Sequence, residues 1–343
     1  MNECNLFFNT KKYQLRTHAY QAISGFIALE RQKIISLNIN FDRDVDIPLA
    51  NAFYSEINGR KVIYDIEDGT NNLLPDTIDY IHKKNILLFK RAYDEQLFKN
   101  DRMIRPYGLN YNIFIHYYIE KGIDYLARKN FLHPSTLRFS LSKLQDWSFI
   151  NSSTRHTNRI LFCTRLWNRN ETHSPVDFLN DKRIQVILSL RKAFPNNIIA
   201  GVKDSSLSRK LCKDLILPSK ITRRNCYLNL VSDSSVCIAT TGLHRSIGWK
   251  FGEYVASGKA IVTEPLSFLI PGDFHDGKNY LSFASTDDLI DRCDYLLSNP
   301  EKRREMEMNN IDYYIHNLRP DVLIWNTLKQ ALDDSTDNVS IPQ

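Results

Sequence analysis

The sequence predicts an α/β protein with two domains, and three observations support this prediction. Residues 236–265 contain the pattern of a buried strand, an amphipathic helix and a second buried strand, which together form a βαβ unit. The first half of the chain alternates between strand and helix patterns, as a parallel α/β domain requires. The 343 residues suggest about two domains, because a domain usually has about 100–200 residues.

The domain boundary is predicted from composition. Residues 151–158 are rich in Ser, Thr and Asn and show no apolar period, which is typical of a linker. We therefore predict an N-terminal domain at residues 1–150, a linker at 151–157 and a C-terminal domain at 158–318.

Apolar periodicity predicts the individual elements. In the N-terminal domain we expect strands at residues 6–8, 33–37, 61–65 and 86–89, and helices at 13–30, 48–57, 76–83 and 114–129. Asp76 is the expected cap of the third helix. In the C-terminal domain we expect strands at 159–164, 197–202, 236–239, 259–263 and 280–283, and helices at 177–193, 227–232, 286–297 and 300–316.

The helix predicted after residue 245 has an apolar face and a separate polar stripe. The apolar face holds Ile247, Phe251, Tyr254 and Val255, and the stripe holds Ser246, Lys250, Glu253 and Ser257. Gly258 is expected to end the helix in the left-handed conformation.

The loop at residues 240–245 is expected at the ligand edge, because it joins the carboxyl end of a parallel strand to a helix. Gly242 would let backbone amides approach a ligand, and Arg245 and Lys250 would add positive charge. These features suit a phosphate or diphosphate. Glu253 could accept hydrogen bonds from the two vicinal hydroxyls of a ribose. The alternative is an ordinary core helix with a solvated polar stripe.

Residues 252–265, GEYVASGKAIVTEP, resemble the donor-binding segment of glycosyltransferases of the two-Rossmann-domain (GT-B) type, especially the group 1 and CgeB-like branch. The resemblance covers residues 160–304. It implies two Rossmann-like domains facing a cleft and a helix at 319–335 that crosses back to the first domain. The composition of residues 336–343 predicts a polar tail after that helix. It also implies that the nucleotide sugar binds the second domain and that the acceptor enters from the first.

The resemblance extends to single residues of the donor site. Arg165, at the end of a predicted strand, matches a basic residue that the family turns toward the donor diphosphate, and Lys203 and His244 are further donor contacts that we expect at this edge. Many retaining members carry two Glu eight positions apart. Glu253 matches the second, whereas Arg245 stands at the position of the first, so that half of the motif is absent.

The function implied is transfer of a sugar from a nucleotide-sugar donor to a hydroxyl of a glycan or lipid-linked acceptor, in bacterial-type surface polysaccharide or glycoconjugate synthesis. The leaving diphosphate needs Arg, Lys and helix N–H groups, including Arg245, and we expect no cofactor and no bound metal. Two alternatives remain: a nucleotide-sugar epimerase or phosphorylase of the same fold, and a catalytically silent nucleotide-sugar-binding module.

Three carboxylates follow the strand predicted at residues 61–65. Asp65, Glu67 and Asp68 would lie at the crevice edge, where one of them could act as general base on an acceptor hydroxyl if transfer inverts the anomeric centre. Lys90 and Arg91 follow the next strand and could meet an anionic acceptor. The alternative is that Asp68-Gly69 forms a turn that its neighbours cap or solvate.

Composition limits the setting of the protein. The chain has a formal net charge of +6 and six cysteines without metal-site spacing, and no apolar run approaches the ~20 residues that span a bilayer. We expect free thiols and a cytoplasmic location. The basic stretch at 208–225 could contact an anionic membrane surface or help to hold nucleotide phosphates. No nucleic-acid-binding motif is present, and we expect no nucleic-acid partner.

Overall fold

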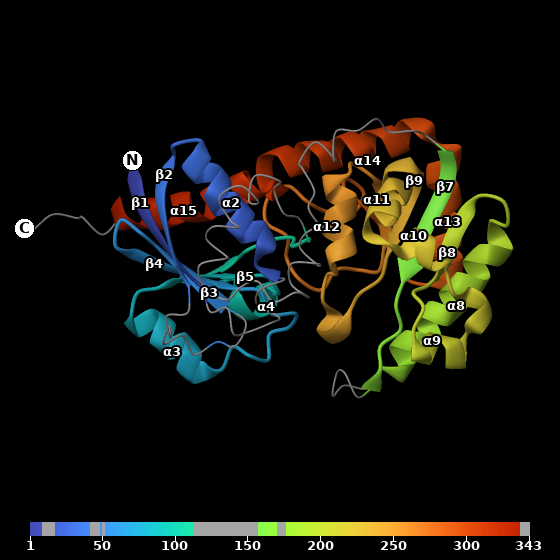
Figure 1. The fold of residues 1–343 in the computed structure, drawn as a ribbon, viewed down its shortest axis with the longest axis horizontal. Coiled ribbons are helices and arrows are strands. Elements are labelled where there is room, and N and C mark those ends of the chain that lie inside the picture. The colour runs from blue at the N-terminus through green and yellow to red at the C-terminus, as the bar shows by residue number, and fades with distance from the viewer. Residues whose placement is uncertain (9–17, 42–48, 50–51, 113–156, 170–175, 337–343) are drawn as a thin grey trace, which may run out of the picture.

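The computed structural model describes residues 1–8, 18–41, 49, 52–112, 157–169 and 176–336. These residues form two α/β domains, each built on one sheet flanked by helices (Figure 1). The linker predicted at 151–157 and the helix predicted at 114–129 lie outside the described residues, except for Thr157, which begins a strand. Of the predicted tail, Thr336 ends the last helix, and residues 337–343 are not described.

The N-terminal sheet has six strands in the order β2-β1-β3-β4-β5-β6. Its elements are β1 (Asn2–Phe8), α2 (Tyr20–Arg31), β2 (Ile35–Phe41), β3 (Ala52–Ile57), β4 (Arg60–Asp65), α3 (Pro75–Lys83), β5 (Leu87–Lys90), α4 (Glu95–Phe98) and β6 (Ile104–Pro106). Strand β3 is antiparallel to both β1 and β4, and the other pairs are parallel. The sheet is therefore mixed, not wholly parallel as the alternation of elements predicted.

The prediction of a helix at residues 48–57 is wrong, because residues 52–57 form strand β3. The strand pairs with β4 through a two-residue turn in which Asn58 has φ 47° and Gly59 has φ 81°. Two positive φ angles define the type I′ turn that Asn-Gly favours between antiparallel strands. The dipeptide was the sequence signal for this hairpin.

Helix α3 also begins differently from the prediction. Its N-cap is Leu74, which makes no side-chain capping bond, and Pro75 is the first helical residue. Proline suits that position because its missing N–H would be unpaired there in any case. Asp76 therefore lies inside the first turn, where its charge complements the helix dipole, and does not cap the helix.

The C-terminal sheet has five parallel strands in the order β11-β10-β9-β7-β8. Its elements are β7 (Thr157–Thr164), α8 (Asp177–Ala193), β8 (Ile198–Val202), α9 (Ser206–Leu211), η2 (Lys213–Leu215), α10 (Ser219–Thr222), α11 (Arg224–Asp233), β9 (Ser234–Ala239), η3 (Leu243–Arg245), α12 (Trp249–Ala256), β10 (Ala260–Thr263), β11 (Leu281–Ser282), α13 (Thr286–Ser298) and α14 (Pro300–Tyr313). The predicted helix at 177–193 and the βαβ unit around α12 are confirmed.

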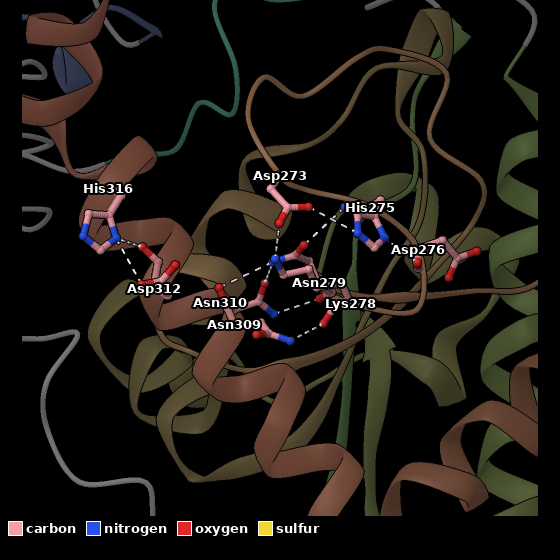
Figure 2. A network of polar contacts seen from close by, with 9 residues as sticks. All are labelled: Asp273, His275, Asp276, Lys278, Asn279, Asn309, Asn310, Asp312 and His316. Atoms are coloured by element: carbon pink, nitrogen blue, oxygen red, sulfur yellow. Dashed lines mark hydrogen bonds and ion pairs between the residues drawn. The ribbon is translucent and has the colours of Figure 1, made fainter.

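The long connection between β10 and β11 is held to α14 by side-chain amides (Figure 2). Asn279 Nδ2 donates to Asn310 Oδ1 at 3.1 Å, and Asn310 Nδ2 donates to the carbonyls of Lys259 and Asn279 at 2.8 Å each. The Asp273 carboxylate pairs with Lys278 and lies 3.3 Å from the His275 ring nitrogen Nε2. These contacts fix a loop that reaches the N-terminal domain. There the Leu269 amide donates a hydrogen bond to the Tyr93 carbonyl at 2.9 Å.

The C-terminal helix crosses back to the first domain, as predicted. After η4 (Tyr314–Leu318), helix α15 (Pro320–Thr336) runs along the N-terminal domain (Figure 1). Leu323, Ile324, Leu328 and Ala331 are buried in the N-terminal core with residues of α2 and β4. The two domains and the returning helix are the architecture that the GT-B resemblance implied.

A short segment makes the reverse crossing. Residues 107–112, here called the docking segment, follow β6 and are all buried. Leu109 and Tyr111 belong to the core of the C-terminal domain, packed with residues of α12. The domains are thus joined by an exchange of segments in both directions.

Candidate functional site

A cavity of about 1100 Å³ lies between the two domains. The N-terminal domain contributes His18, Asp68 and Arg91. The C-terminal domain contributes the carboxyl ends of β7, β8 and β9 and the first turns of α11 and α12. Ligand pockets usually measure about 300–1,000 Å³, so the space is large enough for an extended ligand.

The lining of the cavity is strongly cationic. Its described residues include seven Lys or Arg and two acidic residues: Arg91, Arg165, Arg183, Lys203, Arg223, Arg224 and Lys250, against Asp68 and Glu253. A low-dielectric cleft lined mainly by one sign of charge concentrates ligands of the opposite sign. The arrangement therefore favours an anionic ligand.

Two helices begin at the cavity without side-chain caps. The N-cap of α11 is Arg223, whose side chain makes no capping hydrogen bond, and the N-cap of α12 is Gly248, which has no side chain. The first residues of both helices line the cavity. The first backbone N–H groups of a helix have no intrahelical partner, and the helix dipole makes them favourable anion contacts.

The loop between β9 and α12 is held rigidly at the cavity wall. The Thr241 amide and hydroxyl both donate to Glu264 Oε2, at 2.6 and 2.7 Å, and Lys182 Nζ lies 2.5 Å from Oε1. Burial alone would raise the pKa of Glu264, but the hydrogen bonds from Lys182 and Thr241 outweigh it, and the pKa is lowered. Gly242 lines the cavity, and a Cβ there would lie 2.6 Å from Ser246 Oγ. A side chain at this position would therefore collide with the loop itself, and the approach of a ligand to its backbone stays a prediction.

Arg183 is a cavity residue that the sequence analysis missed. It lies on α8 and donates to the carbonyls of Arg165 and Thr241, at 2.7 and 3.0 Å, so it ties together the loops after β7 and β9. Burial lowers the pKa of its guanidinium to about 10, so it remains charged at neutral pH. The sequence signal that could have identified Arg183 is its place on the buried side of the amphipathic helix α8, where a charged residue is unusual.

Three predicted donor contacts line the cavity beside it. Arg165 is exposed, with its guanidinium carbon 3.6 Å from the centre of the Trp167 ring, and Lys203 is exposed at the end of β8. Lys250 donates to the Cys163 carbonyl and lies 5.2 Å from the centre of the Tyr227 ring. Burial lowers the pKa of Lys250.

His244 and Arg245 are placed differently from their prediction. Both are exposed and have positive φ angles of 55° and 60°, and neither belongs to the cavity lining. A Cβ on Gly69 would lie 3.1 Å from His244 Cβ, so this turn faces the N-terminal loop. The structure does not bring these two residues to the site, because the loop makes a tight 3₁₀ turn before α12 begins.

Glu253 lines the cavity and is only 4% exposed. Its Oε1 forms an ion pair with Arg224, while its Oε2 is buried and has no hydrogen-bond partner in the described part of the chain. Ser246, Glu253 and Ser257 are all buried, so the polar stripe is not solvated as the alternative interpretation required. Glu253 Oε2 is thus a buried acceptor, on a residue of the cavity lining, that no described protein group occupies.

The three carboxylates after β4 are separated by the fold. Asp65 is fully buried, with its Oδ2 2.7 Å from Lys90 Nζ and 3.0 Å from Asn72 Nδ2, so it is enclosed away from the cavity. Glu67 lines a small neighbouring pocket instead. Asp68 lines the cavity and is the member of this cluster that could contact a ligand there.

Arg91 connects Asp68 to the second domain. Its Nη1 lies 2.5 Å from Asp68 Oδ1, and its Nη2 donates to the Ile247 carbonyl at 2.6 Å. Lys90 and Arg91 are both paired with aspartates, so their charges are already balanced. An anionic acceptor would therefore gain little electrostatic attraction from Lys90 and Arg91 at this end of the cavity.

Two aromatic residues of the cavity lining, His18 and Trp249, contact each other. The rings of His18 and Trp249 meet edge to face with centroids 4.7 Å apart, across the domain boundary. Burial and the neighbouring Arg91 guanidinium lower the pKa of His18 to about 4. The imidazole is therefore neutral at physiological pH.

The remaining predictions concern metal, membrane and the basic stretch. Among the described residues, no group of three or more His, Cys, Asp or Glu could hold a metal ion, and the prediction that none is needed stays a prediction. No helix in the described part of the chain is long and apolar enough to cross a membrane. The basic stretch at 208–225 is divided, since Arg223 and Arg224 line the cavity while Arg209 pairs with Asp204.

Comparison with known proteins gave one family match. A family model described as glycosyl transferase-like matches residues 212–315, which lie within the C-terminal domain. A search of curated proteins found no match.

Several solved structures are similar at low identity. They include a candidate UDP-N-acetylglucosamine 2-epimerase from Listeria monocytogenes (10% identity, 98% of this chain and 97% of that chain, TM-score 0.44). They also include an α1,3-fucosyltransferase (11%, 97% and 91%, TM-score 0.42) and the C-terminal domain of the group 1 glycosyl transferase LpcC from Francisella tularensis (13%, 49% and 90%, TM-score 0.30). At these TM-scores the similarity carries no argument about function.

Proposed function

We propose that this protein is a GT-B glycosyltransferase that moves a sugar from a nucleotide-sugar donor to a hydroxyl acceptor. The observation that carries the proposal is the cationic cavity between the domains, at which two uncapped helices begin. One buried carboxylate oxygen of its lining residue Glu253 has no partner among the residues that the structure describes. The glycosyl transferase-like match over residues 212–315 supports the same chemistry.

The donor binds the C-terminal wall in this proposal. Its diphosphate lies near the first turns of α11 and α12 and is balanced by Arg165, Lys203 and Lys250. A ribose hydroxyl donates to Glu253 Oε2. As the bond to the sugar breaks, negative charge grows on the diphosphate, and these fixed cations and N–H groups stabilise it. No step requires a metal ion.

The acceptor enters from the N-terminal side, where His18, Asp68 and Arg91 line the cavity. The described charges at this end balance, which suits an uncharged hydroxyl-bearing acceptor such as a glycan. We place the reaction in bacterial-type surface polysaccharide or glycoconjugate synthesis, on the resemblance of residues 252–265 to the donor-binding segment of that group of enzymes.

A panel of nucleotide sugars tests the proposal. A ligand at 100 times its Kd adds about 2.7 kcal/mol to the free energy of unfolding, which a thermal-shift assay detects. Product analysis with and without added hydroxyl acceptors then separates the alternatives. Turnover without an acceptor would indicate an epimerase. Turnover that requires inorganic phosphate would indicate a phosphorylase. Binding without any turnover would indicate a silent binding module. Failure of the whole panel to bind would contradict the proposal.

Replacement of Glu253 by glutamine is expected to weaken donor binding. Glutamine keeps the shape but loses the charge, and a hydrogen bond to a charged group contributes roughly 1.5–3 kcal/mol. We expect nucleoside diphosphate affinity to fall by about tenfold to a hundredfold, with the acceptor KM unchanged. Calorimetry measures the change. Unaltered nucleotide affinity in Glu253→Gln would remove this residue from the site.

Replacement of Arg165 by alanine is expected to slow transfer at saturating donor. The loss should be about tenfold to 10²-fold, below the 10²–10³ of an enclosed oxyanion contact, because Arg165 is exposed and its field is screened. Arg245→Ala is the matched comparison, since it removes an exposed arginine that lies outside the cavity lining. If kcat fell in Arg245→Ala and not in Arg165→Ala, the diphosphate would lie along η3 and not where we place it.

A further inference from the structure

We infer that Arg224 positions Glu253 for the donor and couples donor binding to the docking segment of the N-terminal domain, an inference that rests on the proposed function. Arg224 is the first residue of α11, and its guanidinium divides between two partners. Nη1 forms an ion pair with Glu253 Oε1, and Nη2 donates to the Asn112 carbonyl at 2.8 Å.

The first contact decides how Glu253 meets a ligand. The Glu253 side chain is 4% exposed, and burial of a carboxylate is costly without a cationic partner. Arg224, whose side chain is 16% exposed, is that partner. Because the arginine contacts only Oε1, it restrains the carboxylate and leaves Oε2 without a hydrogen-bond partner among the described residues. Glu253, a residue of the cavity lining, therefore keeps one buried acceptor oxygen with a fixed position for a ligand that enters the site.

The second contact reaches the other domain. Asn112 ends the docking segment, whose Leu109 and Tyr111 pack in the C-terminal core. The segment is held on its own side by Gln21, whose Oε1 accepts from the Tyr111 amide at 3.4 Å, and by Asn110, whose Nδ2 donates to the His18 carbonyl at 2.8 Å. One guanidinium thus contacts both the donor-site carboxylate and the segment that joins the domains.

This sharing has an energetic consequence. A ligand hydroxyl on Glu253 Oε2 restrains the carboxylate, which restrains Arg224 and strengthens its hold on the Asn112 carbonyl. Coupling between two binding equilibria is reciprocal, so a docked segment must also raise donor affinity. The donor would then tighten the domain interface before the acceptor enters.

Two substitutions separate the two roles of Arg224. Arg224→Met removes both contacts, whereas Arg224→Lys keeps a charge for Glu253 but lacks the second arm that reaches Asn112. Lys220→Met is the control, because it removes a positive charge from an exposed residue nearby that does not line the cavity. The probes are UDP, GDP and ADP, measured by calorimetry and by hydrogen exchange of the amides at 109–112.

For the wild-type protein we expect one nucleoside diphosphate to bind and to slow exchange in the docking segment. Arg224→Met should bind it about tenfold to a hundredfold more weakly. Arg224→Lys should bind within about fivefold of wild type but show no added protection at 109–112. Lys220→Met should match the wild type in both measurements.

The contrary outcomes are distinct. Wild-type affinity in Arg224→Met would overturn the positioning role, and wild-type protection in Arg224→Lys would overturn the coupling, in both cases leaving the proposed function standing. Absence of binding by the wild-type protein to all three nucleotides would overturn the proposed function and this inference together. Arg224→Lys also keeps the test valid if Arg224→Met fails to fold.

Discussion

Asp68→Asn is expected to lower kcat by about 10²–10⁴ at unchanged donor affinity, if transfer inverts the anomeric centre. Asp68 is the carboxylate of the cluster after β4 that lines the cavity, and its side chain is 34% exposed. Inversion requires a base to take the acceptor proton, and the amide cannot do so. The Asn oxygen can still accept from Arg91, so the contact between the domains through Ile247 should persist.

The test of Asp68 combines kinetics with the configuration of the product. NMR of the product gives the anomer, and kcat and donor Kd are measured for Asp68→Asn and for Glu67→Gln. Glu67→Gln is the control, because it also removes one negative charge, at a neighbouring residue that does not line the cavity. An inverted product made at normal speed by Asp68→Asn would exclude it as the base. If the product keeps its configuration, no such base is required and the leaving phosphate can take the proton.

Lys90→Met is expected to destabilise the N-terminal domain by about 3–5 kcal/mol. Lys90 and Asp65 are both 0% exposed, and their N–O distance is 2.7 Å. Removal of one partner from a buried ion pair leaves an uncompensated charge in a medium that solvates it poorly. Asn72 and the Glu67 amide still bond to Asp65 but supply no charge.

Urea unfolding, with hydrogen exchange of the β4 and β5 amides, measures this loss. Lys83→Met is the control, since it removes an exposed lysine from α3 of the same domain. Asp65→Asn combined with Lys90→Met should recover part of the stability, because the uncompensated charge is then gone. A loss below about 1 kcal/mol in Lys90→Met would contradict the structural role assigned to the pair. Asp65→Asn should lose stability but keep its kcat per folded molecule.

Local patterns were sufficient for most of the C-terminal domain. Helix α8 begins and ends at the predicted residues, and the βαβ unit around α12 was predicted with its apolar face and its left-handed Gly258, which has φ 58°. In a parallel sheet covered on both faces, strands are short apolar runs and helices carry the 3.6-residue period, so the local signal is strong. The same reasoning placed Gly242 and Glu253 at the ligand edge, and the resemblance to GT-B enzymes added Arg165; all three line the cavity.

Strand β3 shows where the local pattern was not sufficient. Residues 48–57 were predicted as a helix from their apolar pattern, although the Asn58-Gly59 dipeptide that follows this stretch favours a hairpin. Which strands pair with β3 depends on β1, about fifty residues earlier in the chain, and not on the stretch itself.

The sequence by itself determined the fold class and the chemical types at the ligand edge, while the return of the last helix was implied by the resemblance to GT-B enzymes. Only the tertiary structure decided which of those residues meet. It buried Asp65 against Lys90, left Asp68 in the cavity, placed Arg245 outside it and brought Arg183 and Arg224 in. The physical reason is range: helix and strand patterns arise from neighbours a few residues apart. The position of a charged side chain in the site depends on partners far away in the sequence. Arg224 and Glu253 are 29 positions apart, and Arg91 and the Ile247 carbonyl are 156 positions apart.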